Sequence, residues 1–329
     1  MRAPAFWMKR PGVRSMLLRP LGALYAAATA RRMTQAGERV PVPVISVGNL
    51  NAGGTGKTPV VIALQQMLQA LGEAPHVISR GYGGHLHGPV RVHERHHHAD
   101  AVGDEPLLLS AFGPVWVARD RAAGARAAVA DGAGLLVLDD AHQNPSLEKD
   151  LSLVVVDAAV GFGNRLCIPA GPLREPVAAG LARADALVVI GTAGERADFL
   201  AREGPVLPVL EAELRPLATG MPWEDLRVLA FAGIGRPEKM FATLRALGAD
   251  VAQTVALADH QLLTPALMQR LEREASALNA RLVTTEKDAM RLPPARRASV
   301  LTLPVRLAFS DPVEVERLLS GVLAKRDPV

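Results

Sequence analysis

Residues 42–58 have the sequence VPVISVGNLNAGGTGKT, and this stretch decides the fold. Val42–Val47 is apolar and β-branched and predicts a buried strand, while Pro59–Leu71 has the pattern of a helix. Between them, Gly56-Lys57-Thr58 is the end of a P-loop, in the strand–loop–helix setting that such a loop requires. Together these features predict a nucleotide-binding α/β fold.

The loop residues have the chemistry of phosphate binding. Glycines let successive backbone N–H groups turn inward around phosphate oxygens, and the helix N-terminus adds a positive dipole end. We expect Lys57 to reach the β- and γ-phosphates, and the Thr58 hydroxyl to bind Mg²⁺. Asn51 stands where the usual pattern has glycine, and asparagine tolerates a left-handed backbone. The expected nucleotide-binding residues are Asn51, Ala52, Gly53, Gly54, Thr55, Gly56, Lys57 and Thr58.

Short apolar runs, each ending near Asp or Gly, continue the pattern beyond the loop. They are Val115–Ala118, Leu135–Leu138, Leu153–Val156 and Ala186–Ile190. Such runs are typical of strands buried on both faces of a parallel sheet, with helices as crossovers. The Pro-punctuated segment Gly204–Leu214 suits a hinge, after which Arg227–Ala232 and Arg281–Thr285 repeat the βα pattern. We therefore expect a P-loop domain over residues 36–220 and a smaller C-terminal α/β lobe over residues 221–329.

Composition excludes several classes of protein. The 329 residues are 49% hydrophobic and 21% charged, which is a globular composition. Aromatic residues make up only 4%, which argues against stacking platforms for nucleic acid, and the single Cys167 cannot form an internal disulfide or a thiolate zinc site. The net charge of +4 comes from the N-terminus, because residues 1–33 hold seven of the 37 cations and none of the 33 carboxylates. The rest is slightly acidic, so we expect no nucleic-acid partner.

Residues 1–35 mix these cations with apolar side chains. The cations are Arg2, Lys9, Arg10, Arg14, Arg19, Arg31 and Arg32. The longest uncharged run, Pro20–Ala30, has 11 residues, which is short of the roughly 20 that a membrane-spanning helix needs. Three interpretations compete: a secretory signal ending at Ala28-Thr29-Ala30, an amphipathic helix packed on its own domain, and an interfacial helix among lipids. We favour the third, a basic membrane-associated segment.

A P-loop needs an acidic residue at the end of a neighbouring strand to order Mg²⁺. Two segments, Leu135–Asp140 and Leu153–Asp157, meet this requirement. The residues alone leave both open and slightly favour the second segment, because its run is more β-branched.

Seven sequence blocks, the first of which contains the phosphate loop, occur in order along the chain. They are GNLNAGGTGKTP (48–59), ISRGYGG (78–84), VGDEPLLL (102–109), LDDAHQ (138–143), PAGPLREP (169–176), AFAGIGRPEKMF (230–241) and TTEKDAMRL (284–292). Together they resemble the tetraacyldisaccharide 4′-kinases, the lipid A 4′-kinases of Gram-negative bacteria. The basic, apolar N-terminal segment also resembles that family's membrane-associated start.

The resemblance implies an activity and a location. The family transfers the γ-phosphoryl group of ATP, with Mg²⁺, to the 4′-hydroxyl of a lipid disaccharide 1-phosphate in lipid A biosynthesis. The expected partners are this lipid and the surface of the inner membrane, and no protein partner is implied. The protein would be a peripheral protein at the cytoplasmic face of that membrane. The implied fold is a P-loop domain joined by a short β hinge to a smaller lobe.

The resemblance also implies roles for individual residues. Asp104 falls on the family's catalytic carboxylate, and His260 on the histidine that pairs with it, although the family's Asp-His-His is Asp259-His260-Gln261 here. Asp139 and Asp140 fall on the metal-proximal pair, which leaves Asp157 a structural role. The remaining expected residues are Glu105 on the metal side, and Arg80, Tyr82, Arg121, Gln143 and Glu175 on the substrate or phosphate side.

Two other functions compete with a lipid kinase. A metallochaperone GTPase would combine a P-loop with a histidine tract such as His93–His98, but the chain has neither a guanine-reading Asn/Thr-Lys-x-Asp motif nor a set of metal-binding cysteines. We interpret the tract as a solvated loop. A membrane-recruited regulatory ATPase would use the same P-loop and N-terminal helix, and the aspartate of VGDEP favours transfer to an alcohol instead.

Overall fold

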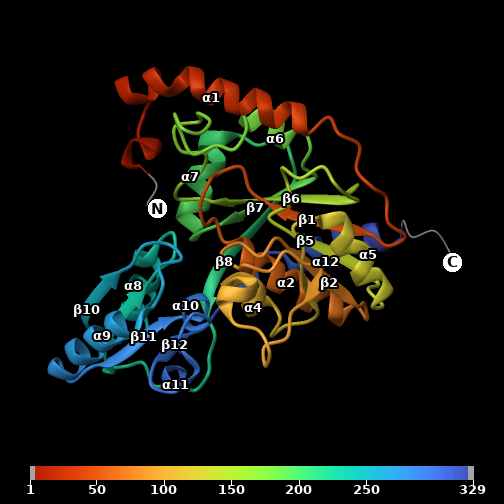
Figure 1. Ribbon diagram of the computed structural model, residues 1–329. Coiled ribbons are helices and arrows are strands. Elements are labelled where there is room, and N and C mark those ends of the chain that lie inside the picture. Colours follow the sequence, from red (N-terminus) through yellow and green to blue (C-terminus); the bar gives the residue numbers. More distant parts are fainter. Residues whose placement is uncertain (1–3, 325–329) are drawn as a thin grey trace.

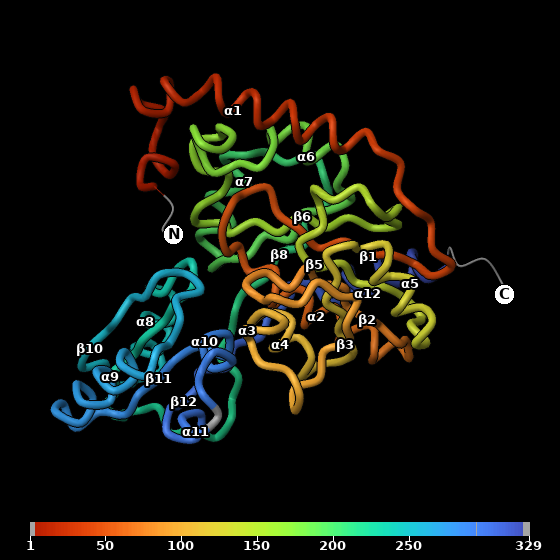
Figure 2. Tube along the Cα trace, in the orientation of Figure 1, coloured from red at the N-terminus to blue at the C-terminus, as the bar shows by residue number. Residues whose placement is uncertain are grey.

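The computed structural model describes residues 4–324 (Figure 1). Arg2, one of the N-terminal cations, and the last five residues of the expected C-terminal lobe lie outside this range. Two sheets, each covered by helices, form two lobes that lie side by side, with the second lobe in cyan and blue in Figure 2.

The first lobe is built on a nine-stranded sheet of order β13-β8-β7-β6-β1-β5-β2-β4-β3. Its strands are β1 (Val44–Gly48), β2 (Pro75–Ser79), β3 (Val90–Arg91), β4 (Val115–Val117), β5 (Leu135–Asp139), β6 (Leu151–Asp157), β7 (Ala186–Ile190), β8 (Val209–Pro216) and β13 (Val305–Phe309). All neighbours pair in parallel except the edge strands β3 and β13, which are antiparallel. The expected α/β fold with a parallel P-loop sheet is confirmed.

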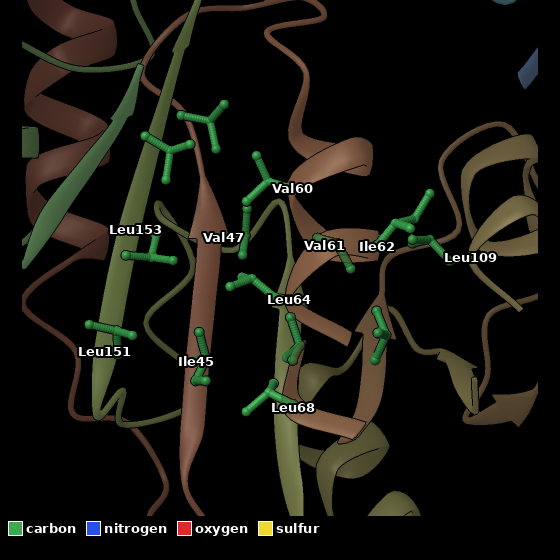
Figure 3. Packing of buried hydrophobic residues seen from close by; sticks show 14 of the residues in the cluster. Ile45, Val47, Val60, Val61, Ile62, Leu64, Leu68, Leu109, Leu151 and Leu153 are labelled. Carbon is green, nitrogen blue, oxygen red and sulfur yellow. The ribbon is translucent and has the colours of Figure 1, made fainter. Parts of the chain in front are cut away.

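Helices cover both faces of this sheet. They are α2 (Lys57–Ala70), α3 (Ala99–Val102), α4 (Asp104–Leu109), α5 (Arg121–Ala130), α6 (Val177–Leu181), α7 (Ala193–Glu203) and α12 (Pro312–Leu323), with the 3₁₀ helix η1 (Ala5–Met8) and α1 (Val13–Arg32) at the N-terminus. On one face, Ile45 and Val47 of β1 pack with Leu64 and Leu68 of α2 (Figure 3). The apolar runs are buried on both sides because helices lie on both sides.

The second lobe is a four-stranded parallel sheet of order β10-β9-β11-β12. Its elements are β9 (Arg227–Ala232), α8 (Pro237–Ala246), β10 (Asp250–Ala256), α9 (Pro265–Ala277), β11 (Arg281–Thr285), α10 (Glu286–Ala289), α11 (Pro294–Arg297) and β12 (Leu301–Leu303). Alternate residues of β9 face opposite ways: Leu229 and Phe231 pack with α9, and Val228 and Ala230 with α8. This lobe therefore has its own core.

The structure differs from the expected lobe boundary at its C-terminal side. After β12 the chain returns to the first lobe, where β13 pairs with β8 and α12 buries Val315, Leu319 and Val322 in the core beside α2. Figure 1 shows α12, in blue, among the elements of the first lobe. Residues 209–214 of the expected hinge segment are also part of the sheet, in β8. The second lobe thus spans about residues 217–304, between two adjacent strands.

The N-terminal helix α1 packs on the first lobe through small residues and turns its apolar side chains outward. Ser15, Gly22 and Thr29, seven residues apart, are its buried positions. A Cβ on Gly22 would lie 2.7 Å from the Cys167 carbonyl oxygen, so the helix approaches the lobe closely there. The exposed large side chains along it are Val13, Met16, Leu17, Leu21, Leu24 and Tyr25. No helix among the described residues is long and apolar enough to cross a membrane.

Candidate active site

The phosphate loop connects β1 to α2 in the expected position. Gly53 and Gly56 have φ of +122° and +91°, a left-handed backbone that only glycine adopts without strain. The buried Asn49 side chain braces the loop by donating hydrogen bonds to the Gly53 carbonyl at 3.2 Å and the Thr55 hydroxyl at 3.0 Å. Gly53 and Gly54 are exposed, so the loop opens toward solvent at its tip.

Asn51 does not have the left-handed conformation that its place in the motif suggests. Its buried side chain donates a hydrogen bond to the Gly161 carbonyl at 2.8 Å, and its backbone forms an isolated β-bridge with Leu173. The next N–H, of Ala52, donates to the Pro172 carbonyl at 2.7 Å. Asn51 therefore holds the start of the loop against the segment that follows β6.

Two aspartates lie beside the loop at the end of β5. Asp140 accepts a hydrogen bond from Arg174 at 2.9 Å and lies 3.6 Å from Nζ of Lys57. Burial opposes its ionisation, but Lys57 and Arg174 outweigh that effect and lower the pKa of Asp140. Asp139 is buried and accepts a hydrogen bond from Ser79 at 2.9 Å. Its burial, with the charges of Glu105 and Asp140, raises the pKa of Asp139 to about 6.

Asp157, the competing aspartate at the end of β6, is already paired with two cations. Both carboxylate oxygens of Asp157 accept from Arg236, at 2.8 and 2.9 Å, and one also accepts from Lys239 at 3.0 Å. Both cations belong to the second lobe. Asp157 thus ties the second lobe to the first, which agrees with the structural role expected for it.

Asp104 and His260 meet across the two lobes. Asp104 begins α4, and its Oδ2 lies 3.0 Å from Nδ1 of His260, while its Oδ1 accepts from the Glu105 N–H at 2.9 Å. His260 has a φ of +56° in the turn after β10. Burial opposes ionisation of Asp104, but the hydrogen bond from His260 and the charges of Lys287 and Arg291 together lower its pKa. Asp104 is therefore held as a carboxylate.

Two cations of this cluster were not predicted as site residues. Lys287 Nζ donates to Glu105 at 3.0 Å and lies 3.2 Å from Nε2 of His260, and Arg291 Nε lies 3.5 Å from Asp104 Oδ2. Both residues lie in the TTEKDAMRL block, and the sequence alone assigned no role to the charged residues of that block. Glu105, expected on the metal side, is ion-paired with Lys287.

The expected substrate-side residues fall into two groups. Arg80 and Tyr82 are exposed after β2, and the Tyr82 ring lies edge-on to His260 with centroids 5.4 Å apart. Arg121 is instead buried, donating to the backbone carbonyls of Ala118 and Asp139 at 3.2 and 2.8 Å.

Gln143 and Glu175 form the rest of the second group, because both are buried. Gln143 donates to the Asn49 carbonyl at 2.8 Å and to Glu175 at 2.9 Å. Glu175 is in turn ion-paired with Arg183 at 2.6 Å. Both side chains are therefore committed to partners beneath the phosphate loop.

Comparison with known proteins identifies the family. A family model described as tetraacyldisaccharide-1-P 4′-kinase matches residues 14–324. The chain belongs to this family. A tetraacyldisaccharide 4′-kinase of Dinoroseobacter shibae is 61% identical over 94% of both chains, and one of Jannaschia sp. is 58% identical over 99% of this chain and 100% of its own. The LpxK structure from Aquifex aeolicus, solved in complex with ATP, superposes with a TM-score of 0.74 at 26% identity, covering 94% of this chain and 99% of that one.

Membership of the tetraacyldisaccharide-1-P 4′-kinase family confirms the expected enzyme class. The protein is a kinase of lipid A biosynthesis, and the relatives do not favour the metallochaperone GTPase or the regulatory ATPase.

Proposed function

We propose that this kinase transfers the γ-phosphoryl group of ATP to the 4′-hydroxyl of tetraacyldisaccharide 1-phosphate at the cytoplasmic face of the inner membrane. The observation that carries the proposal is the contact of 3.0 Å between Asp104 and His260, next to Glu105, whose charge acts on Asp139 beside the phosphate loop. A carboxylate poised to take a proton thus lies near the place where phosphates bind.

Phosphate binding is supported by the loop and Lys57. The backbone from Asn51 to Thr58 and the N-terminus of α2 surround the expected position of the phosphates, and Lys57 is the first residue of that helix. The family relative solved with ATP has the same fold over nearly the full chain. We assign ATP as the phosphoryl donor on this basis.

The residues at the end of β5 fit a magnesium ion. Asp139 is buried, and within residues 4–324 the hydroxyl of Ser79 is its only side-chain hydrogen-bond partner. The neighbouring negative charges of Glu105 and Asp140 disfavour its ionisation. A hard divalent cation bound by oxygen ligands relieves such a cluster. Asp139, Asp140 and the Thr58 hydroxyl would hold the ion, and Glu105 adds negative charge nearby. When bound, Mg²⁺ would neutralise charge on the β- and γ-phosphates.

Asp104 is assigned as the catalytic base. The oxygen of the 4′-hydroxyl forms a bond to the γ-phosphorus, the bond from that phosphorus to the leaving ADP oxygen breaks, and the hydroxyl proton passes to the Asp104 carboxylate. Tyr82, exposed beside His260, and the exposed Arg80 two residues before it are the side chains that we assign to contact the acceptor. Arg121, Gln143 and Glu175 are buried and act by positioning the backbone at Asp139 and Asn49.

The outward face of α1 supports attachment to a membrane surface. Its apolar side chains are exposed, and the exposed Arg14, Arg19, Arg31 and Arg32 are placed to meet anionic head groups. A kinase whose acceptor has acyl chains in the bilayer gains from lying on that surface.

The test is phosphoryl transfer from γ-labelled ATP to tetraacyldisaccharide 1-phosphate in detergent micelles with Mg²⁺. We expect label in a bis-phosphorylated lipid, and loss of that label in Lys57→Ala and Asp104→Ala. Transfer that survives in Asp104→Ala would remove that residue as the base but keep the kinase. ATP hydrolysis without labelled lipid would refute the proposed acceptor.

A further inference from the structure

Lys287 reaches from the second lobe into the contact between Asp104 and His260. It lies in the short helix α10, with only 18% of its side chain exposed, and its Nζ is 3.0 Å from Oε1 of Glu105 in the first lobe. The same Nζ is 3.2 Å from Nε2 of His260. One ammonium group therefore touches both a carboxylate and the imidazole of the proposed dyad.

The protons of this cluster follow from its donors and acceptors. An ammonium group has three donors and no acceptor, so Nε2 of His260 must accept the hydrogen bond from Lys287. A neutral imidazole has one N–H, and with Nε2 as acceptor that N–H is on Nδ1, facing Asp104 Oδ2 at 3.0 Å. An imidazolium would instead direct a second N–H at the ammonium group, leaving two donors face to face.

Lys287 keeps its proton in these surroundings. Burial alone would lower its pKa, but the charges of Glu105, Asp104 and Asp259 outweigh burial and raise it. The other acid near Nε2, Asp259, is 3.8 Å away, beyond hydrogen-bond distance. In the structure, Lys287 is thus the group that decides whether Nε2 carries a proton.

We propose that Lys287 is a positioning residue that fixes His260 as the neutral Nδ1–H tautomer and so leaves Asp104 as the proton acceptor. The proposal deepens the proposed function and rests on Asp104 being the base. Because Nδ1 already carries a proton, His260 cannot take a second one from Asp104 while Lys287 occupies Nε2. His260 orients the carboxylate, and Asp104 alone accepts the hydroxyl proton.

The tautomer is measured directly by NMR of the full-length protein with ¹⁵N-labelled histidine, with His260→Gln used to assign the signal. The wild-type protein is expected to show a protonated Nδ1 and an unprotonated Nε2. An unprotonated Nδ1, or protons on both nitrogens, overturns the proposal without any Lys287 variant. This measurement does not depend on turnover, so it separates a failure of this inference from a failure of the proposed kinase reaction.

Lys287→Met tests the consequence for catalysis, with Lys239→Met as its matched control. Lys239 is also a second-lobe lysine paired with a first-lobe carboxylate, Asp157, but it does not touch His260. In Lys287→Met, Nε2 loses the ammonium donor, and Asp259 is the acid nearest to it in the part of the chain that the structure describes. We expect Nε2 to gain a proton and kcat to fall about ten- to a hundredfold, since a positioned base contributes about 10²–10⁴-fold. KM for ATP should stay within about twofold, and Lys239→Met should keep the wild-type tautomer and kcat within about threefold.

Two results would count against the role of Lys287. The first is an unchanged His260 tautomer and kcat in Lys287→Met. The second is an equal loss of kcat in both variants, which would show that the two lysines act only by holding the lobes together. If Lys287→Met fails to fold, which circular dichroism would show, the wild-type tautomer decides alone.

Discussion

We predict that the outward apolar face of α1 binds a membrane surface, and the exposure of its side chains sets the expected strength of that binding. Leu17 and Leu24 are 75% and 68% exposed, so Leu→Ala at each position removes side chain that solvent already contacts. Each change deletes three carbons, or about 2.4 kcal/mol of transfer free energy at about 0.8 kcal/mol per buried carbon. When each value is scaled by the exposed fraction of the side chain, the Leu17→Ala/Leu24→Ala variant loses at most about 3.4 kcal/mol of membrane-binding free energy. The loss is roughly 2 kcal/mol if the side chains insert incompletely. The double variant should therefore bind vesicles about 30- to 300-fold more weakly.

The assay is co-sedimentation with vesicles that contain anionic lipid, at several lipid concentrations. Val206→Ala combined with Val313→Ala is the matched control, because these side chains are 99% and 72% exposed but lie outside α1. The control should bind like the wild-type protein, and neither pair should change the melting temperature by more than a degree or two, since no buried contact is lost. Vesicle binding of Leu17→Ala/Leu24→Ala within about twofold of wild type would refute the membrane role of this face.

Three further predictions follow from other parts of the structure. Gly22→Val places a side chain against the Cys167 carbonyl and should destabilise the protein by about 1–3 kcal/mol. The melting temperature should fall in this variant but not in Ala23→Val, which changes the exposed side of the helix. Asp104→Asn should lower kcat about 10²–10⁴-fold with KM for ATP nearly unchanged, and a comparable rise in KM would point instead to a nucleotide-binding role. Burial lowers the pKa of Lys149 from 10.5 to about 8, so the unfolded chain binds the Lys149 proton more tightly than the folded protein does. The free energy of unfolding should therefore increase by up to about 3 kcal/mol as the pH rises from 8 to 10.5. Lys149→Met should lack that gain in urea unfolding at the two pH values, and identical pH slopes would contradict the assigned cause.

Local sequence was sufficient to predict the phosphate loop and the parallel sheet. Glycines, a β-branched run and a helical pattern lie within 30 residues of one another around Lys57, and each depends on its own neighbourhood. From the residues alone, sequence slightly preferred Asp157 to Asp139, and only the three-dimensional structure shows that Asp157 is already paired with Arg236 and Lys239.

The features that sequence did not predict all depend on contacts between distant residues. β13 pairs with β8 about 90 residues earlier, and neither strand shows this in its own composition. Asn51 is held by Gly161, which decides its conformation more than its place in the motif does. Lys287 meets Glu105 across 182 residues, so its charge had no visible partner in the sequence.

The return of the chain through β13 makes the second lobe an insertion inside the first. Its entrance and exit are adjacent, with the Leu217 N–H donating to the Pro304 carbonyl at 2.9 Å. A short linker between residues 216 and 305 could therefore replace the lobe without opening the nine-stranded sheet. Such a protein would keep the phosphate loop, Asp104 and α1, yet lack His260 and Lys287. The residues proposed for nucleotide and membrane binding, and the proposed base Asp104, thus lie in the host domain, and the inserted segment would supply the side chains that position that base.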